Sequence, residues 1–286
     1  MSASLPRPSE RGVIDLHLHT TASDGLCEPG ALVDLAWRAG IRTLSVTDHD
    51  TVAALSDVER AALASGISFV PGIEITAVHE GRDVHVLGYF FDPADESLGL
   101  FLERQRDDRV HRLEAIADRL DELGKPIDRD ALFAPRAPGT SLGRPMVAHA
   151  LVEAGHAVDA RDAFDLLIGE GKPAYVPRCG LGPAAVIELI NRAGGVASLA
   201  HPGLLKQDAM IPGLVDSGLT AVEAFHSDHD EATTDHYLTL ADRLGLLVSG
   251  GSDYHGENHR RRLAFGTVGL PPERFDRLKS RARKES

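Results

Sequence analysis

The chain has 286 residues, 43% of them hydrophobic and 26% charged, a composition typical of one large globular domain or of a barrel with an inserted subdomain. Its formal net charge of -13 argues against duplex DNA binding, because non-specific contact with phosphate backbones needs basic stripes. No run approaches the roughly 18 apolar residues of a membrane-spanning helix, and the polar first dozen residues do not resemble a secretion signal. We therefore expect a cytoplasmic protein without membrane contact.

Short runs rich in Val and Ile alternate with segments of helical periodicity, as in an α/β sheet or barrel. Helices are expected from Pro29 to Ala39 and from Pro183 to about Ala193, because proline suits the first turn of a helix and a glycine, here Gly40 and Gly194, suits the position after the last turn. Residues 79–83 have the composition of a hairpin turn, so one antiparallel step is expected. The expected strands are 13–18, 43–47, 68–75, 84–91, 196–200, 221–225, 246–250 and 264–268.

The strand pattern disappears between about residues 97 and 175, where apolar residues recur at helical spacing. The clearest series is Val110, Leu113, Ile116, Leu120 and Leu123. Further helices are expected to begin at Pro145 and near Asp162. We therefore divide the chain into a barrel domain, residues 12–96 and 176–286, and a helical insert, residues 97–175, which would cover the active site. The basic tail 277–286 is expected to be a fraying helix end.

The first expected strand carries polar side chains on one face. Because side chains alternate along a strand, Asp15, His17 and His19 point the same way. A histidine pair of this kind is a modest signal, since such residues are often only hydrogen-bonded. The pair alone therefore leaves a structural rim and a metal site as alternatives.

Other strands also deliver a histidine or an acid at or near one end. These residues are Asp48, His49, Asp50, Glu74, His85, His201, His226, Asp253 and His255. In barrels of parallel strands, the carboxyl-terminal rim is where side chains from different strands converge, and such residues there indicate a site. The recurrence favours a metal site over an isolated histidine pair.

Mixed imidazole and carboxylate ligands suit Mn²⁺, Fe²⁺ or Zn²⁺, and the lack of cysteine in the set argues against structural zinc. The number of candidate ligands predicts more than one ion, and a carboxylate such as Glu74 can bridge two. Ions about 3.5 to 4 Å apart can share a hydroxide nucleophile and clamp the oxygens of a phosphoryl group. Phosphoester hydrolysis is thus the leading reaction class, and amide hydrolysis in an amidohydrolase-like barrel stays open.

Six motifs follow one another over nearly the whole chain: IDLHLHTTASDG, TDHDT, GIEI, VHVLGYF, AHP and GGSDYHG. Together they resemble the polymerase and histidinol phosphatase (PHP) family. The insert motifs GRP (143–145) and PAYVP (173–177) resemble its 3′,5′-nucleotide bisphosphate phosphatase branch, some members of which trim short RNA from the 5′ end. The resemblance implies a distorted, TIM-like (β/α)7 barrel with an inserted helical subdomain, so the eighth expected strand either lies outside the closed barrel or is not a strand.

The resemblance also implies a centre of two or three divalent ions per chain, with Mn²⁺ expected and Fe²⁺ or Zn²⁺ as alternatives. The implied ligands are His17, His19, Glu74 and Asp253 at one ion, Glu74, His85 and His201 at a second, and Asp24, His49 and His255 at a third. Asp24 stands where several relatives have histidine, which matches the nucleotide phosphatase branch and is expected to weaken the third ion.

The resemblance also points to substrate contacts. Arg144 is expected to hold a 5′-phosphate, because a guanidinium can bind phosphate with two hydrogen bonds, and Arg178 is a second candidate. Both arginines can equally form salt bridges within the insert. His226 is either a leaving-group acid or substrate contact, or a cap of the following helix. Met146 stands where histidine is expected in much of this branch, which puts a polar contact in doubt.

The expected reaction is removal of the 3′-phosphate of nucleoside 3′,5′-bisphosphates, such as pAp to AMP and phosphate, by metal-bound hydroxide. His17, His19, Glu74, Asp253 and His226 are the expected catalytic residues. The alternatives are a 5′-3′ exoribonuclease on short 5′-phosphorylated RNA, a phosphatase of another small phosphomonoester, and a PHP module retained as a scaffold. The sequence leaves the oligomeric state open.

Overall fold

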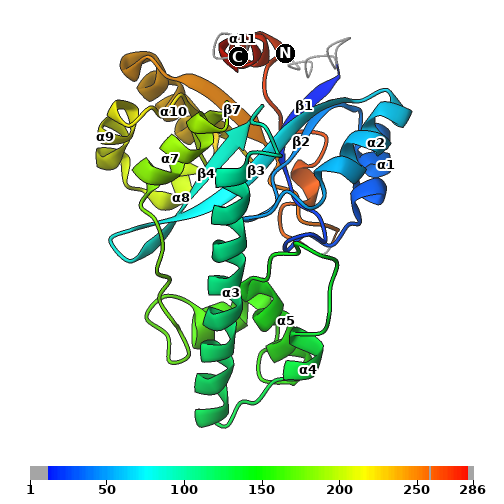
Figure 1. Cartoon of the computed structure of the whole chain (residues 1–286), viewed down its shortest axis with the longest axis vertical. Coiled ribbons are helices and arrows are strands. Elements are labelled where there is room, and N and C mark those ends of the chain that lie inside the picture. Colours follow the sequence, from blue (N-terminus) through cyan, green and yellow to red (C-terminus); the bar gives the residue numbers. More distant parts are fainter. Residues whose placement is uncertain (1–11, 258, 283–286) are drawn as a thin grey trace, which may run out of the picture.

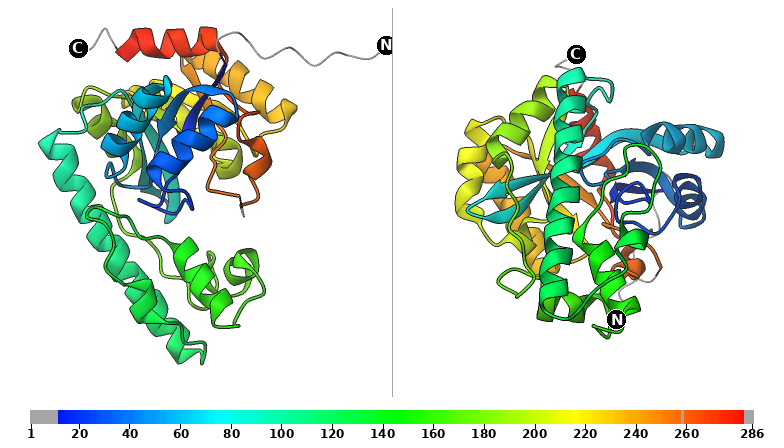
Figure 2. Two further views of the ribbon diagram at one scale, coloured as in Figure 1. Left: turned by 90° about the vertical axis from the view of Figure 1, so that its right-hand side faces the viewer. Right: turned by 60° about the horizontal axis from the view of Figure 1, so that its bottom comes forward.

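The computed structural model describes residues 12–257 and 259–282. The polar start of the chain up to residue 11 and the last four residues of the basic tail, 283–286, therefore lie outside the described residues. The rest of the tail belongs to helix α11 (Pro272–Ala282), which lies across the end of the barrel away from the insert (Figure 2). No helix among the described residues is long and apolar enough to cross a membrane.

Seven strands form one sheet in the order of the sequence (Figure 1). They are β1 (Val13–Leu18), β2 (Ile41–Val46), β3 (Ser68–His79), β4 (Arg82–Tyr89), β5 (Val196–Leu199), β6 (Ala221–His226) and β7 (Leu247–Gly251). Strand β4 runs antiparallel to both β3 and β5, and the other neighbours are parallel. The expectation of a single antiparallel step was wrong, because one reversed strand between parallel neighbours produces two. The hairpin itself is confirmed: Glu80 and Gly81 both have positive φ, as a two-residue turn between β3 and β4 requires.

The barrel closes where the chain leaving β7 meets β1. The backbone N–H of Asp253 donates to the carbonyl of His17 at 2.8 Å, and that of His19 donates to the carbonyl of Tyr254 at 3.0 Å. Gly251 makes this approach possible, because a Cβ there would lie 2.4 Å from the His17 nitrogen. The seam that closes the barrel is therefore also the place where the histidines of β1 meet the acid that follows β7.

Replacing Gly251 with alanine is expected to lower the free energy of unfolding by about 1–3 kcal/mol, because the new methyl group must push the β1 backbone aside. The midpoint of chemical denaturation measures the change. Gly30→Ala in helix α1 is the control, since its added Cβ would meet nothing within 4 Å. Equal stability of the two variants would contradict the tight contact at the seam.

The expected eighth strand at 264–268 was wrong. A short 3₁₀ helix (Arg262–Ala264) ends at the first residue of this segment, and the N–H of Val268 donates back to the carbonyl of Ala264 at 2.8 Å. Gly266 adopts a φ of +75°, which turns the chain and prevents an extended run. The seven-stranded barrel is therefore confirmed.

Helices cover the outside of the barrel (Figures 1 and 2). They are α1 (Pro29–Arg38), α2 (Leu55–Ser65), α7 (Pro183–Arg192), α8 (Pro202–Leu205), α9 (Ile211–Asp216), α10 (Glu231–Leu244) and α11. The predicted starts of α1 and α7 at proline are confirmed, and Gly40 and Gly194 follow these helices with positive φ.

Helix α3 (Glu96–Glu122) connects the barrel to the insert and is longer than its predicted apolar series. Its first turns place Leu98 and Leu102 in the barrel core, and its last turns place Leu113 and Leu120 in a second hydrophobic cluster. The other insert helices are α4 (Arg129–Leu132), α5 (Arg144–Glu153), α6 (Ala160–Ala163) and a π-helical turn (Phe164–Ile168). They form a lobe below the barrel (Figure 2). The exact domain limits stay a prediction.

Candidate metal centre

Glu74 on β3 lies at the middle of the site and is buried. Imidazole nitrogens face both of its oxygens: His17 at 3.2 Å, His19 at 3.2 Å and His49 at 3.4 Å from Oε2, and His85 at 2.7 Å and His201 at 3.0 Å from Oε1. His17 lies on β1 and His19 directly after it, and the other three histidines come from the segment after β2, from β4 and from the segment after β5. One carboxylate therefore contacts two sets of imidazoles, the geometry needed for a bridging ligand.

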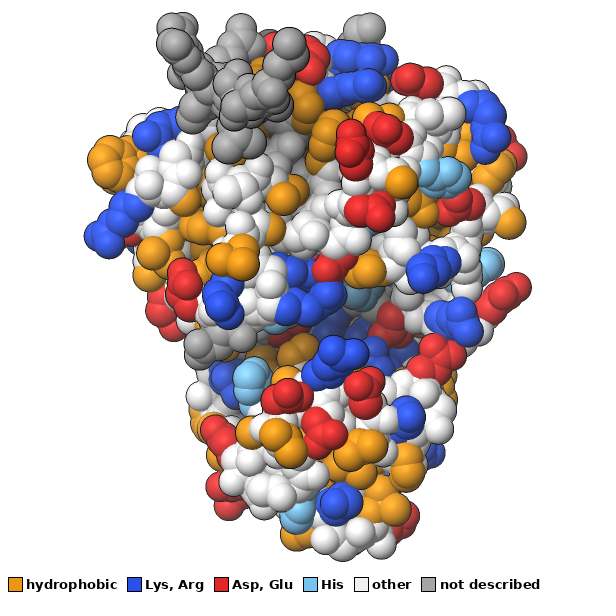
Figure 3. Space-filling view, turned by 180° about the vertical axis from the view of Figure 1, so that it is seen from behind, with side chains coloured by type: hydrophobic (Ala, Val, Ile, Leu, Met, Phe, Trp, Pro, Cys, Tyr) orange, Lys and Arg blue, Asp and Glu red, His pale blue; other side chains and the backbone are white. Residues whose placement is uncertain are grey.

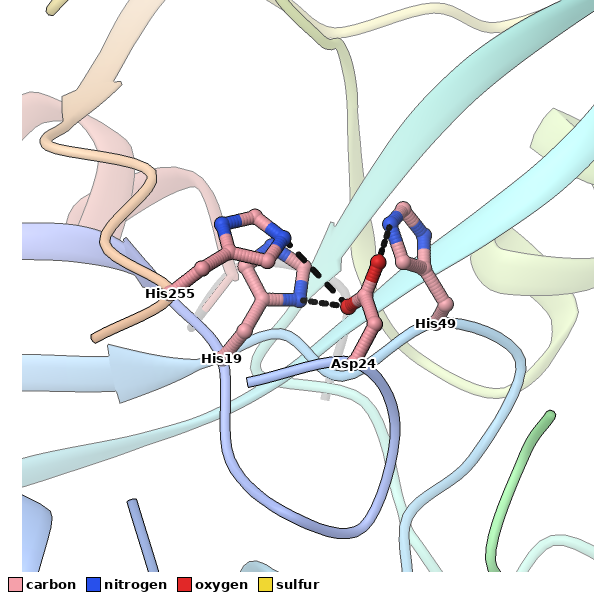
Figure 4. Close-up of side chains that lie close together, drawn as sticks. All are labelled: His19, Asp24, His49 and His255. Atoms are coloured by element: carbon pink, nitrogen blue, oxygen red, sulfur yellow. Dashed lines mark ion pairs between the residues drawn. The ribbon is translucent and has the colours of Figure 1, made fainter. Parts of the chain in front are cut away.

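Asp253 and Asp24 complete two further groups. Asp253 Oδ1 lies 3.5 Å from His17 Nε2 and 3.2 Å from His19 Nε2. Figure 4 shows Asp24 reaching from the loop after β1 to a position between His255 and His49. Its oxygens lie 3.3 Å from His255 Nε2 and 3.7 Å from His49 Nε2. The nine residues predicted as ligands thus lie together, while their role as ligands stays a prediction.

The spacing of these atoms fits divalent ions. Ligand bonds of about 2.0–2.2 Å place neighbouring donor atoms about 3.0–3.5 Å apart around one ion. The separations around Asp253 Oδ1, between 3.2 and 3.5 Å, match this spacing. Several buried donor atoms also lack a hydrogen-bond partner among the described residues: His19 Nδ1 and Nε2, His49 Nδ1 and Asp253 Oδ1. Buried polar atoms without partners are costly, so a cation among them would stabilise the arrangement.

The pKa values of the site residues also fit the binding of divalent ions. Burial alone would raise the pKa values of Glu74 and Asp24, but neighbouring histidines hold both well below the usual range. Burial opposes protonation of His19, yet the carboxylates of Asp253 and Glu74, each 3.2 Å from its Nε2, raise its pKa to about 10. Burial lowers the pKa of His49 to about 3. The carboxylates thus attract positive charge while His49 keeps a neutral ring for a cation, which fits divalent metal binding.

Glu223 supports the centre from β6 and was not predicted from the sequence. Its Oε1 lies 2.8 Å from His17 Nδ1, and its Oε2 accepts the backbone N–H of His201 at 2.7 Å. A carboxylate on one ring nitrogen turns the other, here Nε2, toward the metal position. The only sequence signal is an acid inside the apolar run AVEAFH.

A register shift in β6 brings His226 to the same side as Glu223. The shift lies between Glu223 and Phe225, so two residues separated by an odd number of positions both face the interior. His226 Nδ1 accepts the backbone N–H of Asp228 at 3.1 Å, and Nε2 lies 3.1 Å from Asp253 Oδ2. The neutral ring therefore carries its proton on Nε2, facing the centre. The helix-cap alternative was wrong, because Asp230 caps α10.

The predicted phosphate ligands Arg144 and Arg178 lie beside this centre, around Asp83 on β4. Arg144 Nη2 is 3.2 Å from Asp83 Oδ2, and Arg178 Nε is 3.7 Å from Oδ1. Arg112 on α3, which was not predicted, reaches the same carboxylate at 3.5 Å. We call Arg112, Arg144 and Arg178 the arginine cluster. Met146 is partly buried against the core of the insert.

Buried polar contacts join the arginine cluster to the barrel. Arg109 Nε donates to Asp50 Oδ2 at 2.7 Å, and Arg178 Nη1 lies 3.6 Å from the same atom. Burial and the nearby Arg109 lower the pKa of Arg178 to about 10. Four arginines therefore crowd around two carboxylates, and Arg112 Nη2 and Arg178 Nε have no hydrogen-bond partner among the described residues. Such an excess of buried positive charge favours an anion.

Histidines and carboxylates that converge on one rim of a β/α barrel define the class of metal-dependent hydrolases. A model of the PHP domain matches residues 15–140. A 5′-3′ exoribonuclease, Rnm, from Salmonella typhimurium is 34% identical over 264 residues, which cover 89% of each chain. The chain belongs to the PHP family of metal-dependent phosphoesterases, as its motifs predicted.

Other relatives carry different names. A 3′,5′-nucleoside bisphosphate phosphatase from Chromobacterium violaceum is 30% identical over 264 residues, 91% of this chain and 93% of that protein. A solved structure from Bifidobacterium adolescentis, provisionally described as a metal-dependent phosphoesterase, has a TM-score of 0.87 at 31% identity and covers 96% of this chain and 98% of that one. A Chromobacterium violaceum structure described as an amidohydrolase, with bound sulfate and no metal, has a TM-score of 0.84 at 29% identity and covers 94% and 96%.

Proposed function

We propose that this phosphoesterase removes the 3′-phosphate of nucleoside 3′,5′-bisphosphates. The observation that carries the proposal is the arginine cluster, which lies next to the candidate metal centre. Asp83 and His85 are two residues apart on β4, so their side chains share one face about 7 Å apart. A substrate with two phosphates on one ribose can thus meet the centre with one and the arginines with the other.

The residues of the chain have distinct parts in this proposal. Divalent ions bound by the nine candidate ligands would supply an activated water and neutralise the phosphoryl oxygens. The arginine cluster would hold the 5′-phosphate through the free N–H groups of Arg112 and Arg178. His226, whose neutral ring has its proton on Nε2, would donate a hydrogen bond to the leaving 3′-oxygen and stabilise the charge that develops there, and the proton that this oxygen finally takes up would come from water. Glu223 would keep His17 in place throughout.

The relatives support this substrate class without fixing it. One is named a 3′,5′-nucleoside bisphosphate phosphatase, and one solved structure of the same fold was obtained with sulfate, an oxyanion of phosphate shape. We propose Mn²⁺ as the ion, because mixed imidazole and carboxylate ligands suit it. The cytoplasmic location stays a prediction.

A comparison of three substrates tests the proposal on protein whose metal content has been measured. With Mn²⁺, kcat/KM for adenosine 3′,5′-bisphosphate is expected to exceed that for 3′-AMP and that for an aryl phosphate, because only the first offers a 5′-phosphate to the arginines. 3′-AMP is the matched control, since it differs only by that group. Equal kcat/KM values for the three compounds would overturn the bisphosphate assignment while leaving phosphoester hydrolysis intact.

A 5′-3′ exoribonuclease acting on short RNA is the second candidate. Relatives from Salmonella typhimurium, Escherichia coli and Haemophilus influenzae carry this name, at 34–37% identity. Figure 3 shows a hollow between barrel and insert, with basic side chains along it, that opens to the surface. Stepwise shortening of 5′-phosphorylated RNA, measured beside phosphate release from the bisphosphate, separates the two activities.

A further inference from the structure

Arg261, in the loop after β7, is a buried cation at the edge of the candidate metal centre. Its side chain is 11% exposed. Nε and Nη2 lie 2.8 and 2.7 Å from Asp228 Oδ2, while Nη1 contacts Oδ2 of Asp253. The guanidinium thus has one side anchored on Asp228 and the other directed into the centre.

The two oxygens of Asp253 have different surroundings. Oδ1 faces His17, His19 and His255 at 3.2–3.5 Å and has no hydrogen-bond partner among the described residues, as expected for an ion ligand. Oδ2 instead contacts Arg261 and His226 Nε2. The imidazole and the guanidinium therefore meet at the oxygen of Asp253 that does not face the three histidines.

Asp228 holds both of these donors. Its backbone N–H binds His226 Nδ1 at 3.1 Å, and its carboxylate binds Arg261. Arg260 also reaches this carboxylate, at 2.6 and 2.8 Å, but its side chain is 61% exposed. Asp228 thus fixes the distance between His226 and the Nη1 edge of Arg261.

We propose that Arg261 binds the oxygens of the phosphoryl group that is transferred, with Asp228 positioning it beside His226. Asp228 and Asp253 partly balance the charge of this largely buried guanidinium, but Asp253 would also neutralise the divalent cations beside it, so a phosphoryl group is a favourable further anion there. The guanidinium uses Nε and Nη2 on Asp228, and Nη1, which carries two N–H groups, can contact Asp253 with one and the substrate with the other. Charge that develops on the phosphoryl oxygens strengthens this contact. The inference rests on phosphoester hydrolysis but not on the identity of the second phosphate.

The test compares Arg261→Gln with Arg262→Gln, an exposed residue of the same loop, in the full chain loaded with Mn²⁺. Calorimetric titration with inorganic phosphate is expected to show affinity about ten- to a hundred-fold weaker for Arg261→Gln and unchanged for the control. Metal content should equal that of the unmodified protein. The variant's kcat/KM should fall by the same factor for an aryl phosphate and for adenosine 3′,5′-bisphosphate.

Unchanged phosphate affinity in Arg261→Gln would overturn the proposal, and so would loss of bound metal, which would make Arg261 a support of the ion centre. Arg261→Lys keeps the positive charge but lacks the planar guanidinium, and it replaces the glutamine variant in the test if that variant does not fold. It should retain metal and bind phosphate with intermediate affinity, and wild-type affinity would contradict the role of the guanidinium. Failure of the bisphosphate assignment would instead appear in the unmodified protein, as equal kcat/KM for the two substrates.

Discussion

Replacing Glu74 with glutamine is expected to abolish turnover of every phosphomonoester and to reduce the metal content by at least one ion per chain. The amide keeps the shape of the side chain but loses the charge that five imidazoles surround. Ions contribute several kcal/mol of charge stabilisation to phosphoryl transfer, so we expect kcat/KM to fall by about 10³-fold or more. Elemental analysis and kinetics on the same preparation measure both effects.

Two further variants make this experiment specific. Glu59→Gln, on the exposed face of α2, removes the same charge far from the centre and should change neither quantity. Glu223→Gln should lower metal affinity by about 10- to 100-fold, because Glu223 contacts the ring of His17 rather than an ion. A Glu74→Gln protein with full metal content would contradict the bridging role. Unmodified protein without metal or turnover would support the scaffold alternative.

The candidate ligands could be predicted from the sequence because metal binding restricts both the type of residue and its position in the fold. Few residue types bind divalent ions, and the closed barrel directs strand ends to one rim. His17 and Asp253 are far apart in the chain but adjacent at the seam, where the N–H of Asp253 donates to the carbonyl of His17. The alternation of side chains along a strand was therefore sufficient to predict β1 and the shared face of its polar residues. The order of the motifs predicted the other candidate ligands.

The residues that support the candidate ligands and the arginine cluster could not be predicted in this way. Glu223 lies 206 positions from His17 in the chain, and β6 has a register shift beside it that no local sequence pattern predicts. Its contact with His17 could therefore not be predicted from the sequence. The sequence around Arg112 does not distinguish it from the other charged residues of a long helix, and only the position of α3 in the fold shows that it contacts Asp83. The false strand at 264–268 has a related cause, because a short apolar run does not reveal that Gly266 turns the chain. Long-range contacts decided each of these cases.

Replacing Arg178 with methionine is expected to remove the preference for a second phosphate while leaving the hydrolytic centre active. Hydrogen bonds to charged groups contribute about 1.5–3 kcal/mol, so the ratio of kcat/KM for adenosine 3′,5′-bisphosphate over 3′-AMP should fall by about 10- to 150-fold. The kcat/KM for 3′-AMP should change little, because that substrate does not reach the arginine cluster. Kinetics with the two substrates measure the ratio.

The fold should tolerate this change. Asp83 keeps Arg112 and Arg144, and Asp50 keeps Arg109, so neither carboxylate is left without a partner. Burial and the nearby Arg109 already lower the pKa of Arg178 to about 10, so losing this cation relieves repulsion and should leave the melting temperature nearly unchanged. Arg104→Met, at an exposed position of α3, is the control and should leave the substrate ratio unchanged. An equal loss on both substrates would place Arg178 in the support of the hydrolytic centre rather than in recognition of the second phosphate.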